Sequence, residues 1–153
     1  MSTTTTKKLT KEMLSDYVDL TCEIDEVREK IARCEREIDK INELGTVVDS
    51  VSGGFGGKQH FKIEGLPLPE LMALKKRLVK LKNRLSRKEY DLLDMTIEIE
   101  HRIMDIDDVK IRRVIELKYI KGKTWNEVAI ALGQNVSEDS IRMAFNRFLM
   151  KEE

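Results

Sequence analysis

The stretch that decides the fold is Ile111–Phe148, with the sequence IRRVIELKYIKGKTWNEVAIALGQNVSEDSIRMAFNRF. Apolar residues recur in it at helical spacing, and Gly122 and Gly133 interrupt the pattern. Glycine adopts at little cost the left-handed conformation found just past the end of a helix. The stretch therefore predicts three short helices separated by two tight breaks.

The predicted starts of these helices carry capping residues. Thr124 and Glu127 have the spacing of a capping box, in which the threonine oxygen and the glutamate carboxylate each accept an early backbone N–H. Ser137 is predicted to cap the third helix, and Asp107 or Asp108 the first. Local chemistry thus supports the boundaries that the apolar pattern suggests.

The last helix has one apolar and one polar side. We predict Ile141, Phe145 and Phe148 as its buried face. Two helices joined by a short turn, the second presenting Arg and Asn outward, form a helix-turn-helix motif, in which Arg suits guanine or phosphate and Asn suits adenine. The predicted DNA-binding residues are Lys123, Thr124, Trp125, Asn126, Ser137, Asp139, Ser140, Arg142, Met143, Asn146 and Arg147. The alternative is a small three-helix bundle with solvated arginines.

The segment Gly122–Gly133, GKTWNEVAIALG, resembles region 4 of bacterial sigma factors. In that region the pattern Gly-x-(Ser/Thr)-(aromatic)-x-Glu-(Val/Ile)-Ala-x-x-Leu-Gly precedes the recognition helix, and Glu116–Tyr119 (ELKY) matches the leucine and tyrosine pattern before it. The chain departs from the family in the region of Gln134–Val136, where two residues more than usual precede Ile141. The insertion bears on the docking angle of the last helix.

The whole chain is also similar to a family of small phage and prophage proteins of Gram-positive bacteria, which is related to the ArpU and RinA groups. The shared features are a helical N-terminal half, the segments DSVSGG (49–54) and QHF (59–61), and the C-terminal helix-turn-helix. The resemblance implies a sequence-specific DNA-binding transcription regulator that acts as a sigma-like factor or as a late-gene activator.

Upstream, apolar residues recur in alternating steps of four and three, the spacing of a coiled-coil seam. The first run lies between Leu9 and Leu44 and contains Met13, Tyr17, Leu20, Ile24, Val27, Ile31, Cys34, Ile38 and Ile41. The second run contains Leu71, Leu74, Leu78, Leu81, Leu85, Leu92, Met95 and Ile99. We predict two long helices, the first ended by Gly45 and the second begun at Pro69.

Charge favours an antiparallel hairpin of these two helices. The end of the first is acidic, with Glu35, Glu37, Asp39 and Glu43. The start of the second is basic, with Lys75, Lys76, Arg77, Lys80, Lys82, Arg84, Arg87 and Lys88. Bases left over after this pairing are either solvated or in contact with DNA phosphate or an acidic partner.

The connection at 45–68 is rich in glycine and long for a hairpin. Its outer parts, TVVDSV (46–51) and QHFKIEG (59–65), are predicted to be extended or to pair as a β-ribbon around SGGFGG (52–57). The glycines do not have the order of a phosphate-binding loop.

The composition and the absence of catalytic or metal-binding motifs exclude several classes of function. Of 153 residues 37% are charged and 5% aromatic, which is typical of helical proteins, and the net charge of zero makes any attraction to DNA local. We find no catalytic constellation and no metal-ligand cluster around His60 or His101, so we predict no enzyme, no metal and no cofactor. No long apolar run and no signal peptide are present, so we predict a cytoplasmic protein without membrane contact.

Cys22 and Cys34 lie roughly 18 Å apart if both belong to one straight helix, too far for an internal disulfide. We predict two reduced thiols, with an interchain bond through Cys34 as the alternative.

The sequence predicts an all-α chain with three parts, which are a disordered tail (1–7), a coiled-coil hairpin (8–106) and a sigma-region-4-like DNA-binding domain (107–153). The expected partner is double-stranded DNA, with RNA polymerase as a further candidate. The hairpin either buries both apolar runs internally or forms a homodimer through Leu14, Leu93 and Ile103. Two other functions stay open, a DNA-packaging accessory of the small-terminase kind and a protein-interaction module that binds RNA polymerase without touching DNA.

Overall fold

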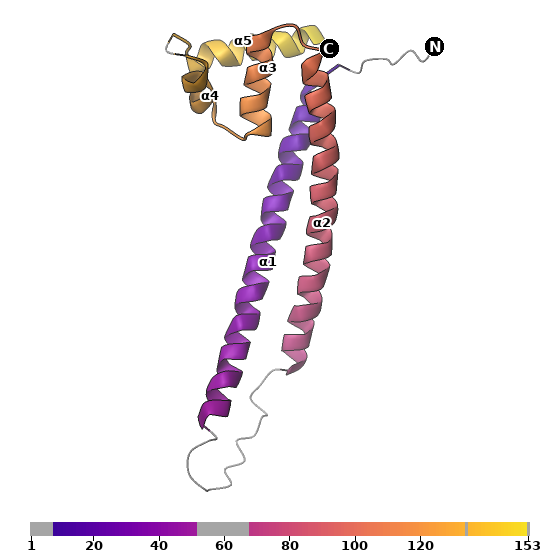
Figure 1. Cartoon of the computed structure of the whole chain (residues 1–153), viewed down its shortest axis with the longest axis vertical. Helices are drawn as coiled ribbons and strands as arrows, with labels where there is room; N and C mark the ends of the chain where they lie inside the picture. The colour runs from indigo at the N-terminus through magenta and orange to yellow at the C-terminus, as the bar shows by residue number, and fades with distance from the viewer. Residues whose placement is uncertain (1–7, 52–67, 134, 153) are drawn as a thin grey trace, which may run out of the picture. The chain divides into compact units, whose positions relative to one another are not determined.

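The computed structural model describes residues 8–51, 68–133 and 135–152, and every regular element in these residues is helical (Figure 1). The elements are α1 (Lys11–Val51), α2 (Leu68–Met104), α3 (Val109–Ile115), the π-helix η2 (Glu116–Ile120), α4 (Trp125–Leu132) and α5 (Glu138–Glu152). The predicted all-α class, with two long helices followed by a three-helix segment, is confirmed for this part of the chain.

The helices pack as two compact units, and α1 and α2 contribute to both. The first unit combines the chain up to Cys22 with the chain from Tyr90 onward, and the second is Glu23–Glu89. Figure 1 shows α1 and α2 side by side within these units. The predicted domain boundary at residue 107 stays a prediction.

The second unit is held by the predicted coiled-coil seam. Its buried residues are Val27, Ile31, Cys34, Ile38 and Leu81, and the half-buried residues packed against them are Leu71, Leu74, Leu78 and Leu85. Ion pairs flank this seam and fix the antiparallel direction, since Glu23 pairs with Lys88 and Glu35 pairs with Lys82 at 3.4 Å. The predicted match between the acidic and basic segments is therefore present at Glu35 and Lys82.

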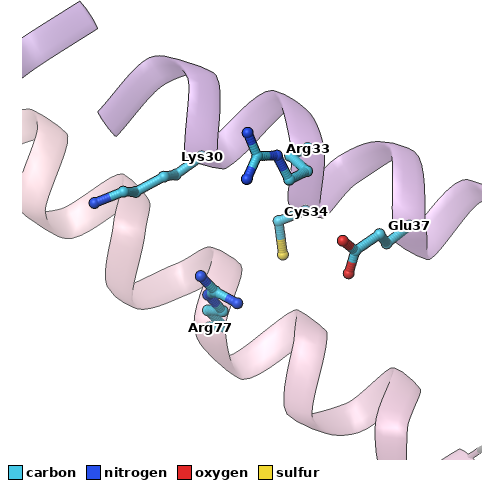
Figure 2. Close-up of a pocket in the computed structure, with 5 residues that line it drawn as sticks. All are labelled: Lys30, Arg33, Cys34, Glu37 and Arg77. Carbon is cyan, nitrogen blue, oxygen red and sulfur yellow. The ribbon is translucent and has the colours of Figure 1, made fainter. Parts of the chain in front are cut away.

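A shallow hollow in this unit contains the thiol of Cys34. Figure 2 shows the residues that line it, which are Lys30, Arg33, Cys34 and Glu37 from α1 and Arg77 from α2. The buried Sγ of Cys34 donates to the carbonyl oxygen of Leu74 at 3.3 Å. Both cysteines are free, and Cys22 is exposed.

The first unit has its own core, which joins the start of α1 and the end of α2 to the C-terminal helices. Its buried residues are Leu9, Leu14, Tyr17, Ile99, Ile111, Val114, Ile115, Val128, Ala129, Ile141, Phe145 and Leu149. Leu14 is therefore a core residue and is not exposed for the alternative dimer face of Leu14, Leu93 and Ile103. Ile103 also packs against this core, whereas Leu93 is exposed.

The end of α1 differs from the prediction. The helix does not stop at Gly45 but continues to Val51, so TVVDSV (46–51) is helical and not extended. An interior glycine costs a helix only about 1 kcal/mol, and the preference of valine for strands is weak outside a sheet. Residues 52–67, which contain the rest of the predicted ribbon, and the tail at 1–7 lie outside the described residues.

The first residues of α2 and α3 agree with the prediction. α2 begins at Leu68 with Pro69 in its first turn, where a missing N–H costs nothing. Asp108 caps α3, and its side chain accepts from the N–H groups of Lys110 at 2.9 Å and Ile111 at 3.3 Å. Among the described helices, none is both long enough and apolar enough to cross a membrane.

Candidate nucleic-acid interface

The first helix of the candidate site changes its winding before it ends. α3 is followed without a break by η2, and the N–H of Lys121 donates to the carbonyl of Glu116 at 2.9 Å. Gly122 then adopts a φ of 67°, as predicted for the residue that ends this helix. A pattern with a period of 3.6 residues cannot reveal such a π-turn, because it changes which side chains share a face.

The capping box of α4 is present. The N–H of Glu127 donates to the Thr124 hydroxyl at 3.2 Å, and the N–H of Thr124 donates to the Glu127 carboxylate at 2.7 Å. Gly133, with a φ of 131°, ends α4 as predicted. Ser137 caps α5, because its Oγ accepts from the N–H of Ser140 at 3.2 Å.

An aromatic cluster holds α4 and α5 against the first helix. The ring of Phe145 lies 5.7 Å from that of Tyr119 and 5.7 Å from that of Trp125, measured between centroids. Such tilted pairs stabilise by about 0.5–1.5 kcal/mol beyond the area they bury. The cluster fixes the face that α5 turns outward.

The buried face of α5 differs in one position from the prediction. Ile141 and Phe145 are buried as expected, but Leu149 takes the third position, and Phe148 is only half-buried. The steps of four residues from 141 to 145 and 149 follow one side of a straight helix, whereas position 148 lies toward its edge.

The opposite side of α5 is exposed and forms the candidate interface. Asp139, Arg142 and Asn146 follow one another at steps of three and four residues, and Met143 and Arg147 lie beside them. All five are exposed, so the side chains predicted to contact bases are accessible. We call these five residues the α5 stripe.

A groove lies between α4 and the start of α5. It is lined by Asn126, Ala129, Ile130, Gly133, Val136, Ser137 and Glu138. The predicted contact residues Asn126 and Ser137 therefore lie at this groove. The prediction missed Ile130, which is exposed although it is apolar. The sequence signal for its exposure is that Ile130 does not share the side of α4 that the buried residues form.

Charges are arranged around Trp125. The Nζ of Lys118 lies 5.2 Å from the centre of its ring, and the guanidinium carbon of Arg142 lies 5.8 Å from it. Both distances allow a cation–π attraction. Arg142 also forms an ion pair with Glu138 at 2.7 Å. Lys118 is absent from the predicted contact residues, because no motif position marks it.

The capping contacts lower the pKa of Glu127. The backbone N–H of Thr124 is the largest cause, followed by the Thr124 hydroxyl and then by Lys123 and Lys118. Burial raises the pKa of the Tyr119 hydroxyl. Glu127 therefore stays a carboxylate at neutral pH and serves the start of α4.

Four of the predicted contact residues, Thr124, Trp125, Ser137 and Ser140, already make contacts within the protein. The hydroxyls of Thr124 and Ser137 act as caps, and the Ser140 hydroxyl donates to the Ser137 carbonyl at 2.9 Å. Trp125 is half-buried and packs in the core. These contacts hold α4 and α5 in position. Only the exposed atoms of these four residues can contact a ligand. Lys123, which precedes the cap, is half-buried.

Comparison of the chain with protein-family models, curated proteins and solved structures finds no match.

Proposed function

We propose that this protein is a sequence-specific DNA-binding transcription regulator that places α5 in the major groove. The α5 stripe carries the proposal, because it combines two arginines, an asparagine and a methionine on one exposed side of a helix that the core holds in place. The major groove is about 12 Å wide and admits an α-helix. In this role Arg142 and Asn146 read base edges, Met143 contacts thymine methyl groups, and Arg147 binds phosphate or guanine.

The segment from η2 to the start of α4 supplies the contacts to the DNA backbone. Lys118, Lys121 and Lys123 lie within six residues of one another, and none of them forms an ion pair within the described part of the chain. Lysines placed in this way bind phosphate and position a protein on a duplex without reading its sequence. Because the chain has no net charge, this local cluster supplies the attraction.

DNA must compete with Glu138 for Arg142. The two side chains are 46% and 42% exposed, so their ion pair is worth only about 0–1 kcal/mol. A bidentate contact with guanine contributes about 1–3 kcal/mol of discrimination. The ion pair is therefore weak enough for a base contact to replace it.

The experiment begins with selection of bound duplexes from a random pool, followed by measurement of affinity at two salt concentrations. We expect binding that weakens steeply with salt. Arg142→Ala with Arg147→Ala should reduce affinity for the selected site by a factor of ten or more, as expected from the loss of about 1–3 kcal/mol per contact. Arg36→Ala with Lys40→Ala removes the same charge from exposed positions of α1 and is the matched control.

Equal affinities of the two double variants would contradict the proposal for the α5 stripe. If the chain binds no duplex at any salt concentration, the protein-interaction function remains. Native mass separates the transcription regulator from the packaging accessory, because a large ring belongs to the latter and a monomer or dimer to the former.

A further inference from the structure

α2 has exposed apolar residues outside the hairpin seam. Besides Leu68 at the start of the helix, they are Met72, Val79, Tyr90, Leu93, Ile97 and Met104, and each is more than half exposed. Single exposed apolar residues need no explanation, but these six belong to one continuous helix and recur at regular intervals. The regularity is what points to a partner.

The intervals are those of a coiled coil. One heptad position contains Met72, Val79, Ser86, Leu93 and Glu100, and a second position contains Lys76, Asn83, Tyr90, Ile97 and Met104. The two positions alternate in steps of three and four residues, so they form one stripe along α2. All ten residues are exposed, and we call them the outer seam.

Charge changes sign along α2. Its first half has exposed bases near the outer seam, among them Lys75, Lys80 and Arg87. Its second half has exposed acids, among them Asp91 and Asp94. A second α2 helix that runs in the opposite direction places bases against acids at both ends, whereas a parallel copy opposes like charges.

We propose that the outer seam binds the outer seam of a second copy of this chain, with the two α2 helices antiparallel. Such a pair has two-fold symmetry, so each contact occurs twice. Charge complementarity along the helix selects the second copy as the occupant.

One register matches the residues at both ends of the outer seam, while near its middle Leu93 faces Asn83 and Tyr90 faces Ser86. When Ile97 faces Val79 of the second copy, Met104 faces Met72 and Lys76 faces Glu100. The two charged residues of the stripe then pair with each other, and apolar residues meet apolar residues near both ends. A shift by one heptad either opposes Lys76 to Leu93 or moves Lys76 past the end of α2 at Met104.

These contacts cannot form within one chain. Lys76 and Glu100 are 24 positions apart on α2, a separation of about 36 Å at 1.5 Å per residue. Neither residue forms an ion pair within the described part of the chain. A cross-link between the two ends of the outer seam therefore reports a second copy.

The test uses cysteines at Met72 and Met104 in the full chain, with Cys22→Ser to remove the exposed native thiol. Met72→Cys with Met104→Cys should form a disulfide-linked dimer under mild oxidation, because position 72 of each copy meets position 104 of the other. Each single variant, Met72→Cys or Met104→Cys, is the matched control and should stay unlinked. Sedimentation equilibrium of the unmodified chain should show a dimer.

A linked dimer in the single variants would mean a parallel pair and would overturn the proposal. A double variant that does not cross-link, or a chain that sediments as a monomer, would do the same. As a check on register, Lys76→Glu should weaken the dimer, and addition of Glu100→Lys should restore it. None of these measurements involves DNA, so their outcome is separate from that of the proposed function.

Discussion

Leu14 tests whether the candidate interface shares a core with the start of α1. Its side chain is 1% exposed and belongs to the same buried cluster as Ile115, Val128 and Phe145. Leu14→Ala removes three carbon groups, which at about 0.8 kcal/mol per buried CH₂ loses about 2.4 kcal/mol of transfer free energy. The cavity left behind adds to this loss, so we expect a total of about 2–5 kcal/mol.

Trp125 provides the assay, because it is the only tryptophan in the chain and packs against this core. Urea unfolding followed by its fluorescence reports the stability of the helices that carry the α5 stripe. With a slope of about 2 kcal/mol per molar urea, a loss of about 3 kcal/mol lowers the midpoint by about 1.5 M. Val18→Ala, on the same helix at a 41% exposed position, is the matched control and should cost less than about 1 kcal/mol.

One outcome would refute the shared core of α1 and the C-terminal helices. If Leu14→Ala leaves the fluorescence midpoint unchanged while circular dichroism shows loss of helix, the C-terminal helices fold without α1. The core shared by α1 and α5 would then contribute nothing to the candidate interface, and a domain that begins at residue 107 would be the better description.

Two further predictions concern single groups. Because the folded state lowers the pKa of Glu127 below its ordinary value of 4.5, its cap stabilises α4 fully above that value and loses this effect as the pH falls through the lowered pKa. The difference in Trp125 fluorescence midpoint between the natural chain and Glu127→Gln should therefore shrink in acid; a difference that stays constant from neutral pH to well below 4.5 would contradict this. A thiol reagent should label Cys22 in the native protein and Cys34 only after unfolding, since Cys22 is exposed and Cys34 is buried; equal labelling rates would show that the second unit opens readily.

Much of the fold could be predicted because its signals are local. The coiled-coil spacing, the capping box at Thr124 and Glu127, and the breaks at Gly122 and Gly133 depend on neighbours a few residues away. The candidate site was accessible to the same reasoning in part, since the spacing of Ile141 and Phe145 leaves Arg142 and Asn146 on the other side of α5.

The failures have physical causes. Gly45 has the same residue type as Gly122, but whether a glycine ends a helix depends on the backbone conformation that the surrounding chain imposes. The π-turn of η2 and the exchange of Phe148 for Leu149 depend on how three helices fit together. Leu14 could not be assigned to a core, because most of the buried cluster to which it belongs lies far along the chain, between Ile99 and Leu149.

The sequence by itself determined the helices, most of their ends and the polar side of α5, because backbone hydrogen bonds and apolar periodicity act over a few residues. Only the tertiary structure decided that α1 and α5 share a core, that Arg142 pairs with Glu138 beside Trp125, and that the six apolar residues of the outer seam stay exposed. Burial depends on which distant segments meet, and no spacing within one helix specifies that.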